Sequence, residues 1–172
     1  MSNSTDETVD ALLGKTAPAF TLSATPGHGH AATDIQDFSV PSLQNQPLVV
    51  FFYPRDDTPG CTNEAKDFAE HYQQITALGA DVLGVSCDSH QSHQKFIAKL
   101  QLPFSLLTDV EGAVASSYGC YKLKKMYGKE FMGIERSTFL INKEGKVSAL
   151  WRKVKVPGHV EEVIRTINNT KL

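Results

Sequence analysis

Apolar residues in this chain alternate between short continuous runs and helical spacing. The segment PLVVFFY, residues 47–53, is a short run rich in β-branched and aromatic residues, which favours a buried strand over a helix. After Gly60, the apolar positions recur three or four residues apart, at Ala65, Phe68, Tyr72 and Ile75. This spacing predicts a helix that ends at the tripeptide LGA, residues 78–80.

The alternation continues to the end of the chain. Four further segments are expected to form a strand, a helix, a strand and a short helix, in that order: 81–86, 89–100, 104–109 and 110–119. Residues 137–151 then predict two strands joined by a glycine-containing turn. A final helix is expected because four apolar residues share one helical face: Val160, Val163, Ile164 and Ile167.

Strands that alternate with helices, followed by a hairpin and a closing helix, predict an α/β fold with a central mixed sheet flanked by helices. We expect residues 15–172 to form a single domain and residues 1–14 to form a flexible N-terminal segment. Residues 23–37, SATPGHGHAATDIQD, are expected to form a loop-like insertion, because they are rich in turn formers and lack an apolar rhythm.

Composition and charge narrow the class of protein. The 172 residues are 41% hydrophobic, which is enough for one globular core, and the net charge is -2. No basic stripe interleaves with aromatic residues, so a nucleic-acid partner is not expected. The first residues are polar and acidic, and no later apolar run reaches membrane-spanning length. We therefore expect a soluble, cytoplasmic protein without a membrane partner.

Three cysteines, Cys61, Cys87 and Cys120, are too few and too dispersed for a disulfide scaffold or a four-ligand zinc site. In a reducing compartment, such thiols are free, reactive or transiently paired. No metal or cofactor is expected. His90 and His93 are expected to lie on a solvated polar face of their helix.

Cys61 stands out because it follows a cluster of turn formers at the expected junction of a strand and a helix. Unpaired backbone N–H groups and the macrodipole at the start of a helix favour the thiolate. Thr58, three residues earlier, has a hydroxyl that can hold the sulfur or an incoming oxygen. The alternative is that Thr58 only caps the helix and Cys61 is a small buried hydrophobic residue.

The segment PRDDTPGCTNEA, residues 54–65, resembles the Pro-x-x-x-Thr/Ser-x-x-Cys signature of peroxiredoxins. Its TPGCT form is similar to the PrxQ or bacterioferritin comigratory protein subgroup of the AhpC/TSA family. Four further segments resemble that subgroup in the same order, and together they extend over nearly the whole chain from about Lys15: GVSCDSHQSHQKF, LPFSLLTD, YGKEFMGIERSTFLINKEGKV and WRKVKVPGHVEEV.

The resemblance implies a thioredoxin-like fold. It also implies a thiol peroxidase that reduces hydrogen peroxide and organic hydroperoxides at the expense of thioredoxin or another thiol reductant. Cys61 matches the peroxidatic cysteine, which becomes a sulfenic acid. Thr58 matches the residue that orients the peroxide, Pro54 the residue that shields the pocket, and Arg136 the arginine that approaches from the hairpin.

Arg136 and a further residue, Glu64, have alternative interpretations. Glu64, one helical turn after Cys61, is a candidate carboxylate partner for the Arg136 guanidinium. Its alternative is a glutamate on the helix surface. Without the resemblance, Arg136 would be interpreted as a surface ion-pair residue.

The sequence departs from the subgroup at the second thiol. One usual position of the resolving cysteine holds Lys66, and the stretch that carries the other, residues 93–100, has no cysteine. Cys120, in an expected loop, and Cys87, at a strand end, remain as candidates for resolution. We expect a mechanism with one essential cysteine that is resolved by an outside thiol, in a monomer, with a weak dimer left open.

Three other classes of protein remain open from the sequence. A thioredoxin-type disulfide exchanger needs Cys-x-x-Cys, but residue 64 is glutamate. A redox sensor or holdase would keep Cys61 without turning over peroxide, and a purely structural domain gives no reason for the set of site residues. The lysines of residues 122–129 are expected in a solvated loop, with docking of a donor protein as the alternative.

Overall fold

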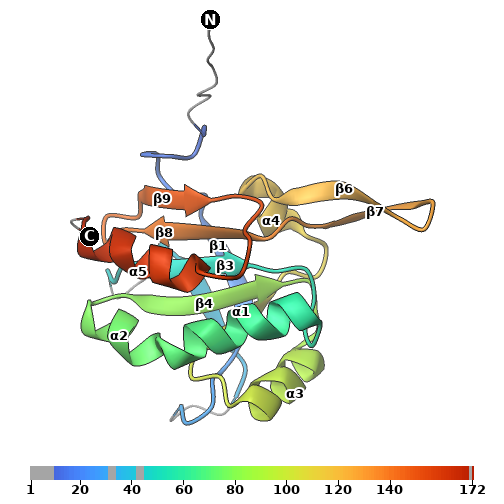
Figure 1. Cartoon of the computed structure of the whole chain (residues 1–172), viewed down its shortest axis with the longest axis horizontal. Coiled ribbons are helices and arrows are strands. Elements are labelled where there is room, and N and C mark those ends of the chain that lie inside the picture. The colour runs from blue at the N-terminus through green and yellow to red at the C-terminus, as the bar shows by residue number, and fades with distance from the viewer. Residues whose placement is uncertain (1–9, 31–33, 42–44, 171) are drawn as a thin grey trace, which may run out of the picture.

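The computed structural model describes residues 10–30, 34–41, 45–170 and 172. Seven strands form one twisted sheet at the centre of the molecule (Figure 1), and their order across the sheet is β2 (Gln36–Val40), β1 (Phe20–Thr25), β5 (Ser105–Thr108), β4 (Asp81–Ser86), β3 (Leu48–Phe52), β8 (Ser137–Ile141) and β9 (Val147–Trp151). Strands β3, β4 and β5 are parallel, and the outer strands pair with their neighbours in antiparallel fashion.

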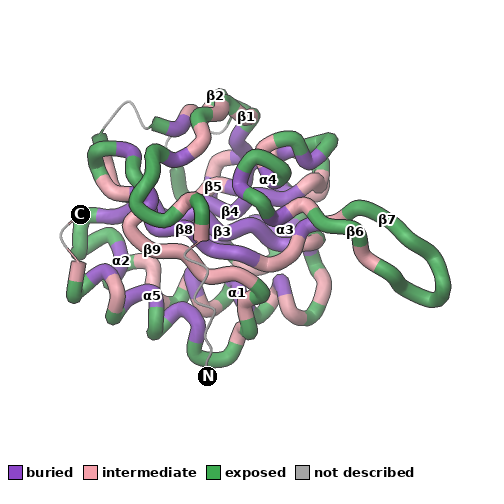
Figure 2. Tube along the Cα trace, turned by 90° about the horizontal axis from the view of Figure 1, so that it is seen from above, coloured by how far each residue is buried: buried purple, intermediate pink, exposed green. Residues whose placement is uncertain are grey.

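The helices cover both faces of this sheet. They are α1 (Pro59–Glu70), α2 (Tyr72–Ala77), α3 (His90–Leu100), α4 (Ala113–Ser117) and α5 (His159–Asn168). Buried residues of α1, α2, α3 and α5 join one hydrophobic cluster, whereas α4 contributes to the other. Figure 2 shows the buried strands β3, β4 and β8 at the centre, between these layers.

Strand β3 shows why the two layers form. All five of its residues are buried, and successive side chains point to opposite faces. Val49 and Phe51 enter the cluster under α1 and α5, while Val50 and Phe52 enter the cluster under α4. A run that is apolar at every position therefore suits a strand covered on both sides.

The predicted α/β architecture with a mixed sheet and flanking helices is confirmed, and it is a thioredoxin-like fold. The strands predicted at 47–53, 81–86 and 104–109 correspond to β3, β4 and β5. The helix predicted to end at residues 78–80 does end there, after Ala77, but it is divided at His71 into α1 and α2.

The interpretation of residues 23–37 as a loop-like insertion was wrong at both ends. Residues 23–25 belong to β1 and residues 36–37 belong to β2, which pair as an antiparallel hairpin at the edge of the sheet. Exposed threonine and serine alternate with half-buried apolar residues in β1, so neither strand has a continuous apolar run. Only the residues between these strands form a connection, and residues 31–33 lie outside the described part of the chain.

The stretch expected to be a solvated lysine-rich loop is instead a second hairpin. Strands β6 (Tyr121–Met126) and β7 (Lys129–Ile134) pair along their whole length and project from the body of the molecule (Figures 1 and 2). Tyr127 and Gly128 form the turn, both with positive φ. This is the backbone twist that two-residue hairpin turns favour.

The flexible segment expected at residues 1–14 falls mainly outside the described residues, which begin at Asp10. The Asp10 carboxylate accepts a hydrogen bond of 2.6 Å from Arg152, and the N–H of Gly14 donates to the carbonyl of Val147. Residues 10–14 are therefore attached to the domain near β9. Among the described helices, none has the length and hydrophobicity needed to cross a bilayer.

Candidate active site

Cys61 lies in the first turn of α1, just after the loop that leaves the carboxyl end of β3. Its side chain is only 1% exposed. Pro59 at the start of the helix has no N–H, so the free N–H groups of this turn belong to the residues around the thiol. The Nη2 group of Arg136, which follows β7 and precedes β8, donates to the Cys61 sulfur at 3.4 Å.

Arg136 also binds Glu64, because its Nη1 group donates to Glu64 Oε1 at 2.8 Å. The Glu64 side chain is fully buried, so the interpretation of Glu64 as a surface residue is wrong. Burial raises the pKa of Glu64 to about 7, although the Arg136 charge acts in the opposite direction. One guanidinium therefore joins a buried carboxyl group and a buried thiol on the same helix.

Two backbone features allow Arg136 to reach this position. A Cβ atom on Gly60 would lie 3.1 Å from Arg136 Nη2, so the absence of a side chain there leaves room for the guanidinium. Behind the arginine, the N–H of Val154 donates to the Arg136 carbonyl at 3.0 Å. The sequence interpretation did not single out Gly60, although close approach is a common reason for glycine beside a reactive residue.

Thr58 occupies the N-cap position of α1, but its side chain makes no capping hydrogen bond. Its hydroxyl instead donates to the carbonyl of Arg55 at 3.0 Å. The oxygen lone pairs of Thr58 are left as acceptors beside Cys61, so the alternative that Thr58 only caps the helix is not supported by the structure.

A hollow of about 420 Å³ reaches the site at Thr58, although Cys61 and Arg136 do not line it. Pro54 and Thr58 form part of its wall, together with Cys87 after β4. The rest of the lining comes from Arg55 and from the second hairpin: Tyr121, Lys124, Met126, Phe131, Met132, Gly133 and Ile134. The hollow therefore offers both apolar side chains and the Thr58 hydroxyl.

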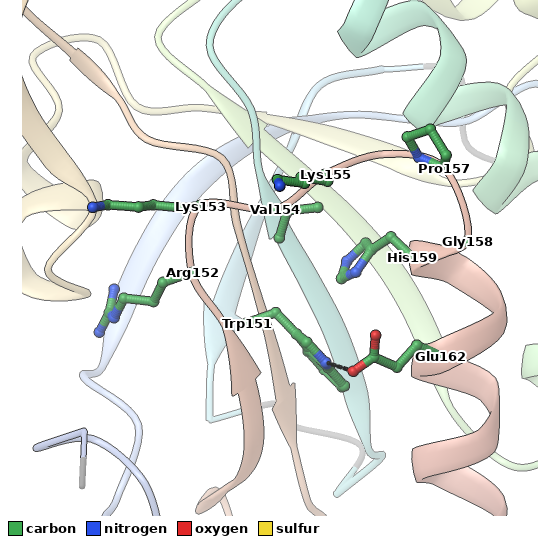
Figure 3. A pocket seen from close by; sticks show the side chains of 9 residues that line it. All are labelled: Trp151, Arg152, Lys153, Val154, Lys155, Pro157, Gly158, His159 and Glu162. Atoms are coloured by element: carbon green, nitrogen blue, oxygen red, sulfur yellow. Dashed lines mark hydrogen bonds between the residues drawn. The ribbon is translucent and has the colours of Figure 1, made fainter. Parts of the chain in front are cut away.

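A second hollow, of about 250 Å³, lies between the end of β9 and the start of α5. Figure 3 shows Trp151 and Glu162 pointing toward one another there, with 2.9 Å between Nε1 and Oε2. His159 is buried at its inner side, and its Nε2 is hydrogen-bonded to Thr138 Oγ1 at 2.8 Å. Burial lowers the pKa of His159 to about 4, so the ring is neutral at neutral pH.

The expectation that His93 lies on a solvated face was wrong. Its ring is fully buried, with Nδ1 at 2.8 Å from an Asp56 carboxylate oxygen and Nε2 at 3.1 Å from the Leu107 carbonyl. Asp56 also accepts a hydrogen bond from the Tyr53 hydroxyl at 2.6 Å. Because Asp56 belongs to the loop that carries Thr58, this network ties the loop to α3.

The apolar stripe of α3 held the signal for the buried histidine. His93 precedes Phe96 and Ile97 by three and four positions, and all three residues are buried on one face. His90 is half-buried and is hydrogen-bonded through Nδ1 to Thr25. No group of three or more potential metal ligands occurs within the described residues.

The two remaining cysteines differ in their relation to the site. Cys120 is fully buried, its N–H donates to the Ala115 carbonyl, and burial raises its pKa to about 12. Cys120 does lie in a connection, between α4 and β6, as expected, but its burial and this hydrogen bond hold it in place. Cys87 is half-buried in the hollow beside Thr58, and burial, with help from nearby Asp109 and Asp88, raises the pKa of its thiol.

Comparison with known proteins decides the family. A family model described as the AhpC/TSA family matches residues 13–150. The chain belongs to the AhpC/TSA family, within its PrxQ/Bcp group of peroxiredoxins. This peroxiredoxin is 44% identical over 157 residues to the peroxiredoxin Bcp of Bacillus subtilis, with 91% of this chain and 95% of the relative covered.

Solved structures agree with this assignment. Peroxiredoxin Q from Xanthomonas campestris superimposes with a TM-score of 0.75 and 39% identity, covering 87% of this chain and 90% of the other. A structure of the bacterioferritin comigratory protein of the same organism, described for its alkyl peroxide reduction activity, gives a TM-score of 0.74, 38% identity and the same coverage.

Proposed function

We propose that this peroxiredoxin is a thiol peroxidase that reduces hydrogen peroxide and organic hydroperoxides to water and alcohols. Cys61 is the peroxidatic residue, and its sulfenic acid is returned to the thiol by thioredoxin or another thiol donor. The observation that carries the proposal is the 3.4 Å contact between Arg136 and the Cys61 sulfur at the start of α1.

The proposed step is a displacement at oxygen. The Cys61 thiolate attacks the terminal peroxide oxygen, a sulfur–oxygen bond forms, and the oxygen–oxygen bond breaks. Sulfur is oxidised to the sulfenic acid, and the departing oxygen becomes water or an alcohol after it takes a proton. The fixed donors of Arg136 stabilise both the thiolate and the charge that develops on oxygen, in a site that excludes bulk water.

The other site residues have supporting roles in this proposal. Glu64 holds the guanidinium through Nη1 while Nη2 contacts the sulfur, and Thr58 orients the peroxide through its hydroxyl. Pro54 shields the site, as expected for a half-buried residue in the wall of the hollow. Preorganised groups of this kind speed the reaction because they need no rearrangement as charge moves.

The hollow beside Thr58 supports reduction of organic hydroperoxides in addition to hydrogen peroxide. Its lining includes Met126, Phe131, Met132 and Ile134, which can contact an alkyl group while the peroxide end faces Thr58. The alkyl peroxide reduction described for the bacterioferritin comigratory protein of Xanthomonas campestris agrees with this substrate class.

Resolution by an outside thiol is supported by the state of the other cysteines. The raised pKa values of Cys87 and Cys120 leave little thiolate for an attack on the sulfenic acid. Lys66 and the cysteine-free helix α3 remove the two usual resolving positions. A one-cysteine cycle is therefore the scheme that these environments favour.

A steady-state assay with a thiol donor tests the proposal and separates it from a redox sensor or holdase. We expect wild-type protein to consume peroxide over many turnovers and Cys61→Ser to consume none, with its circular dichroism unchanged. Substantial turnover by Cys61→Ser would remove Cys61 from the mechanism. One equivalent of peroxide consumed without further turnover would identify a sensor.

A further inference from the structure

Lys124 differs from the other lysines of the β6–β7 hairpin. Lys122 and Lys125 are exposed, whereas Lys124 is half-buried and lies in the wall of the hollow that Thr58 also lines. Its ammonium group donates a hydrogen bond to the carbonyl of Ile134, at the foot of the hairpin. The charge of Lys124 is therefore held at the end of the hairpin nearest the active site.

Gly133 provides the space for this arrangement. Across the hairpin, Lys124 pairs with Phe131 and Lys122 pairs with Gly133, so Lys124 must extend along the neighbouring strand to reach Ile134. A Cβ atom on Gly133 would lie 3.2 Å from Lys124 Cδ and 3.5 Å from Cε. The lysine stem thus crosses the surface that a side chain at position 133 would occupy.

The charges around Lys124 connect it to the reacting group. Burial lowers the pKa of Lys124, and the positive charge of Arg136 lowers it further, whereas the charges of Cys61 and Glu135 act in the opposite direction. Among the described residues, no carboxylate lies within ion-pair distance of the Lys124 ammonium. Arg136, in contrast, shares its charge with Glu64.

We propose that Lys124 is a second cationic residue of the active site, which attracts the Cys61 thiolate and donates a proton to the oxygen that leaves the peroxide. The inference rests on the proposed peroxidase function. In this step, the departing oxygen carries both electrons of the broken oxygen–oxygen bond. It takes a proton from the Lys124 ammonium to become water or an alcohol, and the neutral amine then takes a proton from solvent.

The first test compares Lys124→Met with Lys122→Met, which removes the same charge from an exposed position on the same strand. Peptide-resolved alkylation of Cys61 across pH, without peroxide, reports the thiolate. Single-turnover oxidation by hydrogen peroxide reports the chemical step. We expect Lys124→Met to move the alkylation midpoint to higher pH and to slow oxidation roughly a hundredfold, the lower range for a general acid, while Lys122→Met changes neither.

A conservative variant separates charge from proton donation. Arginine keeps the positive charge but does not give up its proton. We expect Lys124→Arg to restore the alkylation midpoint and leave oxidation slow. Full recovery of the oxidation rate would contradict proton donation, and an unchanged midpoint in Lys124→Met would contradict the electrostatic role. If wild-type protein does not turn over peroxide, the proposed function fails, but the alkylation midpoints still decide the role of the charge.

A double-mutant cycle tests whether Gly133 positions the Lys124 side chain. Gly133→Val should displace the lysine stem and slow oxidation in the wild-type background. It should add little in the Lys124→Met background, where no ammonium remains to be misplaced. An equal effect of Gly133→Val in both backgrounds would contradict the positioning of Lys124 by this glycine.

Discussion

Arg136 and Glu64 form a buried ion pair with 2.8 Å between Nη1 and Oε1, although 72 residues separate them in the chain. The second oxygen of Glu64 has no hydrogen-bond partner among the described residues. The pair fixes the guanidinium against α1, which also carries Cys61. Removing either partner would leave the other charge buried without compensation.

Loss of the arginine should therefore impair chemistry strongly. We expect Arg136→Met to slow Cys61 oxidation by about two to three orders of magnitude, the scale of losing one preorganised donor. Single-turnover oxidation measures the rate. Arg165→Met, an exposed substitution on α5, should leave the rate unchanged. Equal rates for Arg136→Met and wild-type protein would assign Arg136 to a structural role.

Glu64 should make the protein less stable as pH rises. Its folded pKa of about 7 lies above the ordinary value of 4.5, so the folded state holds the proton more tightly and stability is lost between about pH 4.5 and 7. Glutamine does not titrate, so Glu64→Gln should lack this pH dependence. Between pH 4.5 and 7, the free energy of unfolding of the variant should therefore rise relative to that of wild type by on the order of 3 kcal/mol. Denaturant titrations at both ends of this pH range measure the difference in unfolding free energy, with the exposed Glu70→Gln as control. A difference between Glu64→Gln and wild type that stays the same at both pH values would contradict the raised pKa of Glu64.

His159 should act in the opposite direction. Burial lowers its pKa to about 4 from 6.5, so the unfolded chain binds the proton more readily and stability is lost as pH falls from about 6.5 to 4. We expect His159→Gln to lack this loss, which is on the order of 3 kcal/mol. Thermal or denaturant unfolding across this range checks the prediction. The control His28→Gln, at an exposed position, should lose stability with falling pH as the wild type does. An equal loss in His159→Gln would contradict the lowered pKa of His159.

The His93–Asp56 pair should be important for stability. His93→Ala removes the 2.8 Å partner of the buried Asp56 carboxylate, and loss of a hydrogen-bond partner by a buried polar group costs about 1–3 kcal/mol. Urea unfolding at neutral pH measures the change, and Gln94→Ala at the neighbouring exposed position should cost little. A loss as small as that of Gln94→Ala would show that water replaces the pair.

Continuous apolar runs were sufficient to predict the centre of the fold. Strands β3 and β4 are buried on both faces, so their sequences are apolar at nearly every position. Strands β1 and β2 are at the sheet edge, and β6 and β7 project into solvent, so their sequences contain serine, threonine or lysine. These polar positions interrupt the apolar pattern, so periodicity alone does not report the two hairpins.

The candidate site was predictable only in part for a similar reason. Cys61 and Thr58 lie three residues apart, and the position of Cys61 at a helix start follows from the turn formers before it. The burial of Glu64 and His93 depends on how α1 and α3 pack, and these helices carry charged residues on their other faces. The position of Lys124 depends on a glycine across the hairpin, a relation visible only when the register is known.

The most direct test of the central claim is peptide mapping by mass spectrometry after one equivalent of hydrogen peroxide, with a sulfenic-acid trap present. We predict one adduct of the trap on Cys61, with Cys87 and Cys120 unmodified. In a separate assay, Cys87→Ser and Cys120→Ser should retain turnover with a small-thiol donor. A dominant disulfide between Cys61 and Cys87 or Cys120, with turnover lost in the matching serine variant, would contradict the one-cysteine scheme. Oxidation that leaves Cys61 unmodified would contradict the assignment of Cys61 itself.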